Sequence, residues 1–254
     1  MDTIKLGHKT LFRLGLGTNR VTEQSGDILR YAAKRGINFI DTAHVYTGGV
    51  SEKVIGETLA PYPENLMVAT KGGMSGASVT VLRQELEQSL TSLVTDCIHL
   101  YQLHRVDPQV SLEESVSTLK QFQKEGKIEH IGLSEVTVEQ IKRAQTVATV
   151  ATVQNHYNVA ERKYDDVVDY CTEHGIIFIP FFPLGGRSGD NRIEAHLKKL
   201  ATKYRASTEQ LALAWLLKRS PLMLPIPGTL SPDHLDANIA AASIELSDED
   251  FASI

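Results

Sequence analysis

Residues 37–59 read INFIDTAHVYTGGVSEKVIGETL, and this stretch decides the fold. Apolar and β-favouring residues at positions 37–40 predict a short strand that ends at Asp41. Ser51 then begins a predicted helix, whose apolar residues recur at helical spacing. We therefore expect Asp41 at the C-terminal end of a strand and Tyr46 in the loop that follows it.

The same arrangement occurs at the next two predicted strands. The apolar run LMVAT, residues 66–70, is followed directly by Lys71, and the run CIHLYQL, residues 97–103, is followed by His104. Three successive strands thus each end on a side chain that can carry or release a proton.

Strand and helix signals alternate along the whole chain, after a β-hairpin predicted around GHK at residues 7–9. The expected strands cover residues 11–16, 37–41, 66–71, 96–103, 127–133, 149–154, 176–182 and 223–226. The expected helices cover 25–34, 51–60, 79–93, 111–124, 137 onward, 161–173, 192–204, 208–218 and 231 onward, with capping boxes at Ser111–Glu114 and Thr137–Gln140. The strands are nearly continuous apolar runs, which is typical of parallel strands that helices cover.

About eight strand–helix units in 254 residues fit a closed (β/α)8 barrel, whose usual length is about 250 residues. The competing fold is a doubly wound sheet. However, residues 15–20, GLGTNR, lack the last glycine of its GxGxxG phosphate-binding pattern. We predict a (β/α)8 TIM barrel with an N-terminal hairpin, forming a single domain over residues 1–254.

Composition excludes several classes of function. The formal net charge is -5 and the pI about 6.0, with both signs mixed along the chain, so we expect neither a nucleic-acid nor a membrane partner. No apolar run approaches the ~20 residues of a membrane span, and we expect a cytoplasmic protein that is a monomer or weak oligomer. Cys97 and Cys171 have no CxxC spacing, so no metal site is expected.

In a barrel of this kind the C-terminal ends of the strands meet at one mouth, where active sites lie. Asp41, Tyr46, Lys71 and His104 should therefore share a pocket. A phenol, with an ordinary pKa of roughly 10, is a poor acid, and a nearby ammonium group strengthens it as a proton donor. Lys71 can supply that ammonium, Asp41 can hold Lys71 by an ion pair, and His104 can donate an N–H to a substrate oxygen. Such a site suits carbonyl reduction beside an electron donor.

Six motifs resemble those of the aldo-keto reductase superfamily in order and spacing. They are DTAHVYTGGVSEKVIGETL (41–59), ATKGG (69–73), DCIHLYQLHRVDP (96–108), GKIEHIGLSEV (126–136), VQNHYN (153–158) and LPIPGT (224–229). The resemblance is closest to the small bacterial and fungal branch that includes pyridoxal reductase-like proteins and general oxidoreductases. It implies NADPH-dependent, reversible reduction of an aldehyde or ketone without a Rossmann domain. Tyr46 would be the general acid, assisted by Asp41, Lys71 and His104.

The resemblance also implies a set of cofactor contacts. The strand-end residues would lie along the nicotinamide and its ribose, Phe181 would stack on the nicotinamide, and the following loop would face the pyrophosphate. The segment after the eighth strand would hold the 2′-phosphate and adenine. The residues concerned are Gly17, Thr18, Asn19, Asp41, Ser134, Glu135, Gln154, Phe181, Phe182, Pro183, Leu184, Gly185, Arg187, Pro227, Gly228, Thr229, His234 and Asn238.

Independent of the resemblance, Gly228 allows close approach of the backbone, and the helix that begins at Ser231-Pro232 offers N–H donors to an anion. This chain nevertheless has Gly228 and His234 where many relatives carry Lys and Arg, and Glu135 where many carry Asn. A neutral imidazole is a weaker phosphate partner than a guanidinium, so NADH is the alternative cofactor.

Two other functions are open at the level of sequence. Lys71 at a strand end could form a Schiff base, as in a lyase or aldolase. Alternatively, the chain could be a nicotinamide-binding regulatory or scaffold protein with slow turnover. The natural carbonyl substrate is not encoded in any motif, because specificity in this architecture resides in variable loops.

Overall fold

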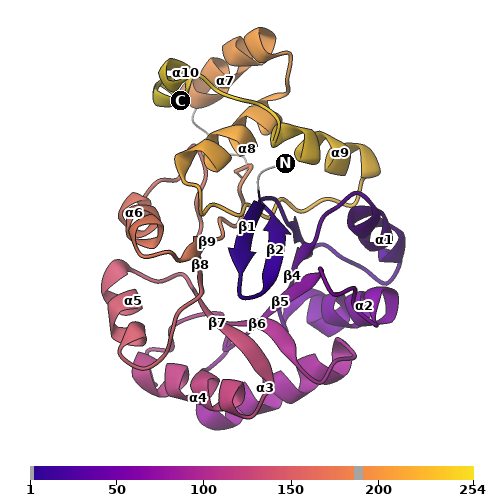
Figure 1. Ribbon diagram of the computed structural model, residues 1–254, viewed down its shortest axis with the longest axis vertical. Coiled ribbons are helices and arrows are strands. Elements are labelled where there is room, and N and C mark those ends of the chain that lie inside the picture. Colours follow the sequence, from indigo (N-terminus) through magenta and orange to yellow (C-terminus); the bar gives the residue numbers. More distant parts are fainter. Residues whose placement is uncertain (1–2, 186–190) are drawn as a thin grey trace.

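The computed structural model describes residues 3–185 and 191–254. Seven parallel strands are hydrogen-bonded in sequence order, from β3 to β9, and they curl into a barrel that the helices surround (Figure 1). A separate antiparallel pair, β1 and β2, forms the expected hairpin. The fold is therefore the predicted (β/α)8 barrel with an N-terminal hairpin.

The strands follow the expected apolar runs but are shorter. They are β1 (Thr3–Leu6), β2 (Lys9–Phe12), β3 (Leu16–Gly17), β4 (Phe39–Asp41), β5 (Met67–Gly72), β6 (Ile98–Leu103), β7 (Ile128–Ser134), β8 (Thr152–Gln154) and β9 (Ile177–Phe178). The predicted strand 11–16 was wrong in its bounds. Its first residues belong to the hairpin strand β2, and the first barrel strand begins only at Leu16.

The last expected strand, 223–226, closes the barrel without forming a regular strand. The Phe178 N–H in β9 donates to the carbonyl of Leu222, just before this segment, and the Phe178 carbonyl accepts from the Leu224 N–H, each at 2.9 Å. On the other side, backbone N–H groups in and before β3 donate to the carbonyls of Pro225 and Pro227 at 2.9 and 3.3 Å. Because proline has no N–H, Pro225 and Pro227 cannot donate backbone hydrogen bonds to β3. The parallel ladder is therefore incomplete.

The helices lie on the outside of the barrel (Figure 1). They are α1 (Gly26–Lys34), α2 (Val50–Leu59), α3 (Val79–Ser92), α4 (Leu112–Lys124), α5 (Val138–Gln145), α6 (Asp165–Glu173), α7 (Asn191–Tyr204), α8 (Thr208–Arg219), α9 (Pro232–Ala241) and α10 (Asp248–Ser253), with a 3-10 turn, η1 (Tyr46–Gly49). Across the described residues, no helix combines the length and the apolarity that crossing a membrane requires.

Some helix details differ from expectation. α6 begins at Asp165 instead of 161, because Asn158 and Glu161 bond to each other's backbone and hold a turn there. The expected capping box at Ser111 is only half formed, since Ser111 accepts from the Glu114 N–H without a returning bond. The box at Thr137 has both bonds. η1 and α10 were not expected.

One end of the barrel is sealed by the hairpin, which lies across it in Figure 1. Ile4, Leu6 and Leu11 of the hairpin are buried in the same apolar cluster as Phe39 and Leu100 of the barrel strands. Burying these side chains excludes water from that end. The C-terminal ends of the strands, and any pocket that they form, lie at the opposite end.

Candidate active site

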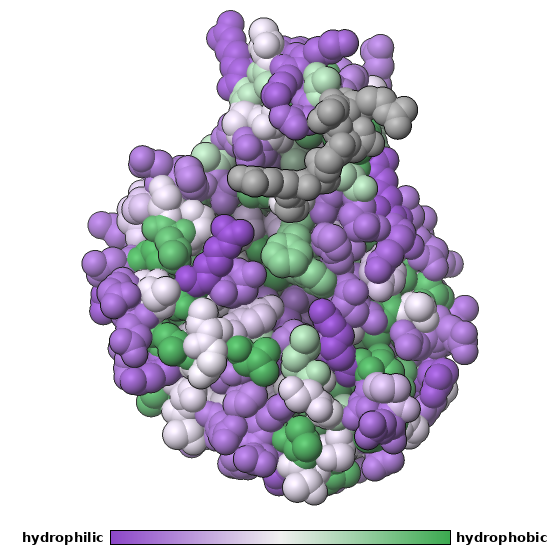
Figure 2. Space-filling view, turned by 180° about the vertical axis from the view of Figure 1, so that it is seen from behind, coloured by the Kyte–Doolittle hydropathy of each residue, from purple (hydrophilic) through white to green (hydrophobic). Residues whose placement is uncertain are grey.

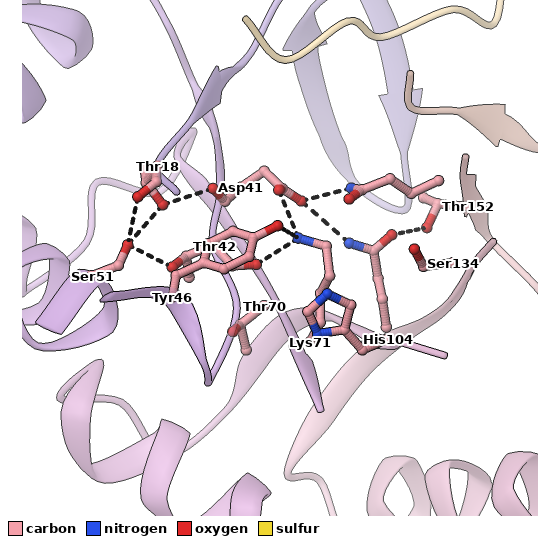
Figure 3. Close-up of polar contacts among 12 residues, drawn as sticks. Thr18, Asp41, Thr42, Tyr46, Ser51, Thr70, Lys71, His104, Ser134 and Thr152 are labelled. Atoms are coloured by element: carbon pink, nitrogen blue, oxygen red, sulfur yellow. Dashed lines mark hydrogen bonds and ion pairs between the residues drawn. The ribbon is translucent and has the colours of Figure 1, made fainter. Parts of the chain in front are cut away.

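The C-terminal ends of three neighbouring strands bring the expected polar residues together. Asp41 is the last residue of β4, Lys71 lies at the end of β5, and His104 follows β6. Tyr46 begins η1, in the loop after β4, and its side chain points toward Asp41 and Lys71 (Figure 3). Figure 2 views this end of the barrel, where apolar and polar side chains are mixed around the mouth. The mouth contains a cavity of about 410 Å³.

Lys71 is the centre of the arrangement. Its ammonium donates to Asp41 Oδ2 and to the Thr42 carbonyl, both at 2.7 Å, and to the Tyr46 hydroxyl at 3.4 Å (Figure 3). The Lys71 side chain is only 1% exposed. Burial on its own lowers the pKa of Lys71, but the charge of Asp41 and the contact with Tyr46 outweigh it, so that the pKa is raised. Lys71 is therefore an ammonium ion.

The Asp41 carboxylate is enclosed by donors. Besides Lys71 on Oδ2, Gln154 donates to Oδ1 at 2.8 Å and Gln102 at 3.4 Å. A buried carboxylate is tolerable only when it is paired and hydrogen-bonded, and here both conditions hold. Asp41 thus fixes the position of Lys71 and is itself kept from solvent.

His104 lies beside Lys71 and faces the ring of Tyr46 (Figure 3). The two ring centroids are 6.0 Å apart and the rings are nearly perpendicular. Burial, together with the positive charges of Lys71 and Arg105, lowers the pKa of His104 to about 3, so the ring is neutral near pH 7. Its buried Nδ1 atom has no hydrogen-bond partner among the described residues. A neutral imidazole can donate one N–H to a substrate oxygen.

A hydroxyl network fixes the loop that carries Tyr46. Ser51 lies within 2.8 Å of both the Thr18 and the Thr42 hydroxyls, and the Thr18 hydroxyl donates to the Asp41 carbonyl at 2.8 Å (Figure 3). The loop then turns at two glycines with φ of 68° and 90°, a conformation that favours glycine. The first turn of α2 is thereby tied to the ends of β3 and β4.

Most of the expected cofactor residues line the same cavity. These are Gly17, Thr18, Asn19, Asp41, Ser134, Gln154, Phe181, Phe182, Pro183, Leu184, Gly185, Pro227 and Gly228. The backbones of Gly17 and Gly228 approach each other closely. A Cβ atom on Gly17 would lie 2.7 Å from the Ile226 carbonyl oxygen, and one on Gly228 would lie 3.1 Å from the Gly17 carbonyl oxygen. Only glycine fits at this close contact, the Gly17–Gly228 closure, without displacing the backbone.

The donors and acceptors in the cavity fit a nicotinamide. Gln154 uses its side-chain amide nitrogen on Asp41, and no described residue donates to its side-chain oxygen Oε1. Ser134 offers a hydroxyl near it, because the last residues of β7 and β8 are paired in register. Phe181 presents a ring that stacks on His156 at a centroid distance of 5.4 Å and meets the edge of Phe182 at the same distance. A carboxamide could pair with Gln154 and Ser134 while its aromatic ring packs on Phe181.

Four expected cofactor residues do not line the cavity. Glu135 has a φ of 56° and directs its carboxylate to the His156 N–H at 2.6 Å and the Tyr164 hydroxyl at 3.4 Å. Thr229 and His234 lie just before and in the first turn of α9, and Asn238 lies further along that helix, all beyond the lining residue Gly228. The Arg187 expectation falls outside residues 3–185 and 191–254, which the structure describes.

The cavity also has lining residues that the sequence reasoning missed: Arg20, Val45, Met74, Arg105 and Ile226. A signal existed for Arg105, because it directly follows His104 at a strand end, and for Arg20, which follows Asn19. Val45 and Met74 lie in loops, where side-chain direction has no periodic signature.

Residues 13–254 match the sequence model of the Aldo/keto reductase family. An oxidoreductase of unassigned activity from Schizosaccharomyces pombe is 41% identical, over 99% of this chain and 88% of its own length. Pyridoxine 4-dehydrogenase of Escherichia coli is 34% identical, over 100% of this chain and 97% of its own. A Klebsiella pneumoniae aldo-keto reductase, solved in complex with NADPH, aligns with a TM-score of 0.88 and 29% identity, over 96% of this chain and 90% of that one.

Proposed function

The chain belongs to the aldo/keto reductase family, and we propose that it reduces an aldehyde or ketone to the alcohol, reversibly, with NADPH as its electron donor. The observation that supports this proposal most strongly is the position of the Lys71 ammonium, between the buried Asp41 carboxylate and the Tyr46 hydroxyl at the cavity wall. NADPH is supported by the NADPH complex of the Klebsiella relative and by the cavity's fit to a nicotinamide.

In this proposal Tyr46 gives its proton to the carbonyl oxygen of the substrate. The Lys71 ammonium, 3.4 Å from the phenolic oxygen, stabilises the negative charge that the departing proton leaves on Tyr46. Asp41 keeps Lys71 in place. The neutral His104 ring donates an N–H to the same substrate oxygen and orients it. The reverse reaction uses Tyr46 as the base.

When bound, the nicotinamide supplies a hydride to the carbonyl carbon. Ser134 and Gln154 would hold its carboxamide, Phe181 would pack on its ring, and the Gly17–Gly228 closure would let the cofactor run close to the backbone. Thr229, His234 and Asn238 would hold the 2′-phosphate and adenine end, beside the N-terminus of α9. Loop residues 182–185 would cover the pyrophosphate.

The Schiff-base alternative fits the geometry poorly. A lysine must be neutral to attack a carbonyl carbon, whereas the pKa of Lys71 is raised and its three hydrogens are directed to Asp41, Thr42 and Tyr46. A regulatory protein would have the same cofactor site and would differ only in its turnover. The rate of carbonyl reduction therefore distinguishes it from an enzyme.

The proposal is tested by following cofactor absorbance at 340 nm with a panel of aldehydes and ketones, using NADPH and NADH in parallel. We expect carbonyl-dependent oxidation of NADPH and recovery of the matching alcohol. Saturable NADPH binding without reduction of any carbonyl would favour the regulatory function. Borohydride trapping of a carbonyl on Lys71, with no nicotinamide requirement, would favour the lyase.

A further inference from the structure

The charges on the cavity wall are unevenly distributed. Its ionisable lining residues include one carboxylate, Asp41, which is about 1% exposed and paired with Lys71. His104 is neutral near pH 7. Two guanidinium groups, Arg20 and Arg105, therefore supply the charge that the described wall offers to a ligand.

Arg105 is held in place without being neutralised. Its Nη1 donates to the His104 carbonyl at 2.8 Å and to the Ser134 hydroxyl at 3.3 Å. No described residue accepts from its Nε or Nη2, and no described carboxylate forms an ion pair with it. A guanidinium fixed at one nitrogen, with two others free, is prepared to bind a carboxylate through two parallel hydrogen bonds.

Two acidic residues, one close to Arg105 in sequence and one next to its partner Ser134, are occupied elsewhere. Asp107 accepts from the backbone N–H groups of Ala77 and Gln109, both at 2.8 Å. Glu135 follows Ser134 directly, but its carboxylate bonds to the backbone N–H of His156. The described residues therefore leave the charge of the Arg105 guanidinium available to an anionic ligand.

Three large apolar side chains also line the cavity. Val45, Met74 and Phe182 line it and are among the exposed large apolar side chains of the described residues. Exposed apolar groups that gather at a cavity are typical of a ligand site. A ligand that satisfies both features has an apolar body and an anionic group.

Resting on the proposed function, we propose that Arg105 binds the carboxylate of the substrate, and that the preferred substrates are aldehydes or ketones carrying a carboxylate on an apolar body. Arg105 lines the cavity together with His104, which would orient the substrate carbonyl, and with Ser134, whose hydroxyl its Nη1 contacts; an anion on Arg105 would therefore lie beside the reacting carbonyl. Arg20 is exposed and follows Asn19, beside the Gly17–Gly228 closure assigned to the cofactor, and it serves as the matched control.

The test compares carboxylate substrates with their uncharged amides. The probes are 3- and 4-formylbenzoate, 4-oxobutanoate and 6-oxohexanoate, each beside its amide, with NADPH saturating. For at least one pair we expect kcat/KM to favour the carboxylate by about 10- to 100-fold, the range of a charge-assisted hydrogen bond. Arg105→Gln should abolish this ratio, Arg105→Lys should keep part of it, and Arg20→Gln should leave the ratio unchanged.

A ratio near one for every pair in the wild type, or a ratio that survives Arg105→Gln, overturns the proposal. An equal loss for carboxylate and amide assigns Arg105 to positioning Ser134 and also overturns it.

A binding measurement separates this inference from the proposed function. Calorimetric titration of the NADP⁺-loaded protein with benzoate and with benzamide needs no turnover. We expect benzoate to bind more tightly, with the difference lost in Arg105→Gln. If benzoate has no advantage, the inference fails even when neutral aldehydes are reduced. If benzoate has the advantage but no carbonyl is reduced, the proposed function fails and the anion site remains.

Discussion

The ammonium nitrogen of Lys71 lies 3.4 Å from the hydroxyl oxygen of Tyr46 and 4.9 Å from the centroid of its ring. A cation at this distance interacts with the hydroxyl oxygen and with the face of the ring. Loss of a proton from Tyr46 would strengthen both contacts. The arrangement therefore favours a phenol that gives up its proton during reaction.

Replacing Lys71 with Met should impair both folding and activity. The variant leaves the Asp41 carboxylate buried without its counter-charge, which typically costs about 3–5 kcal/mol of the free energy of unfolding. Activity should fall on the order of 100-fold or more, since the developing charge on Tyr46 loses its partner. Urea unfolding and kcat/KM measure the two effects.

The double variant Asp41→Asn, Lys71→Met is the control for this pair. With both charges removed, the free energy of unfolding should return most of the way to the wild-type value, while activity should stay low. A double variant as unstable as Lys71→Met alone would show that the pair is not held by mutual neutralisation.

The stability of the protein should depend on pH through His104. Its pKa is about 3 when folded, against roughly 6.5 in an unfolded chain. Below pH 6.5 the unfolded chain takes up a proton that the folded chain excludes, so the free energy of unfolding decreases as pH falls toward 3. For this group the decrease is about 2 kcal/mol between pH 7 and pH 5.

Denaturant unfolding at pH 7 and pH 5 tests this expectation against His104→Gln. The pKa values of His99 and His130 are also lowered, and these residues contribute with the same sign in both proteins. The variant should therefore lose a share of the pH dependence and keep the rest. If the free energy of unfolding changes equally between pH 7 and pH 5 in His104→Gln and in the wild type, His104 does not exclude a proton in the folded protein. That result would contradict a neutral ring at position 104.

Cofactor choice should respond to His234. It lies in the first turn of α9, where its backbone N–H donates to Ser231. His234→Arg should tighten NADPH by about 10-fold relative to NADH, because a guanidinium pairs with the 2′-phosphate that NADH lacks. His196→Arg on α7 adds the same charge away from α9 and is the control. Equal tightening of both cofactors in His234→Arg would exclude a 2′-phosphate contact.

Much of the fold could be predicted because apolar periodicity and caps are local. The Thr137–Gln140 box and the apolar runs before Asp41, Lys71 and His104 are correctly placed. The closing segment 223–226 was predicted as an ordinary strand, although Pro225 within it and Pro227 directly after it cannot donate to a regular ladder. Its pairing depends on β9 and β3, which lie far away in sequence, and local patterns do not report such partners.

The meeting of Asp41, Tyr46, Lys71 and His104 could be predicted for a different reason. Parallel strands place their C-terminal ends at one face, so position within each strand was sufficient. The direction of loop side chains follows no such rule. Glu135 was expected to face the cofactor, but its carboxylate bonds to His156 and Tyr164 outside the cavity wall. Arg105 was overlooked, although it follows a strand-end residue.

The most direct test of the central claim is Tyr46→Phe, assayed for NADPH binding and carbonyl reduction on the same preparation. The variant loses only the hydroxyl oxygen, so the dissociation constant for NADPH should stay nearly unchanged, while kcat should fall by about 10²- to 10⁴-fold. A Phe variant that reduces carbonyls at a rate close to wild type would contradict the account, because the proton would then come from another group.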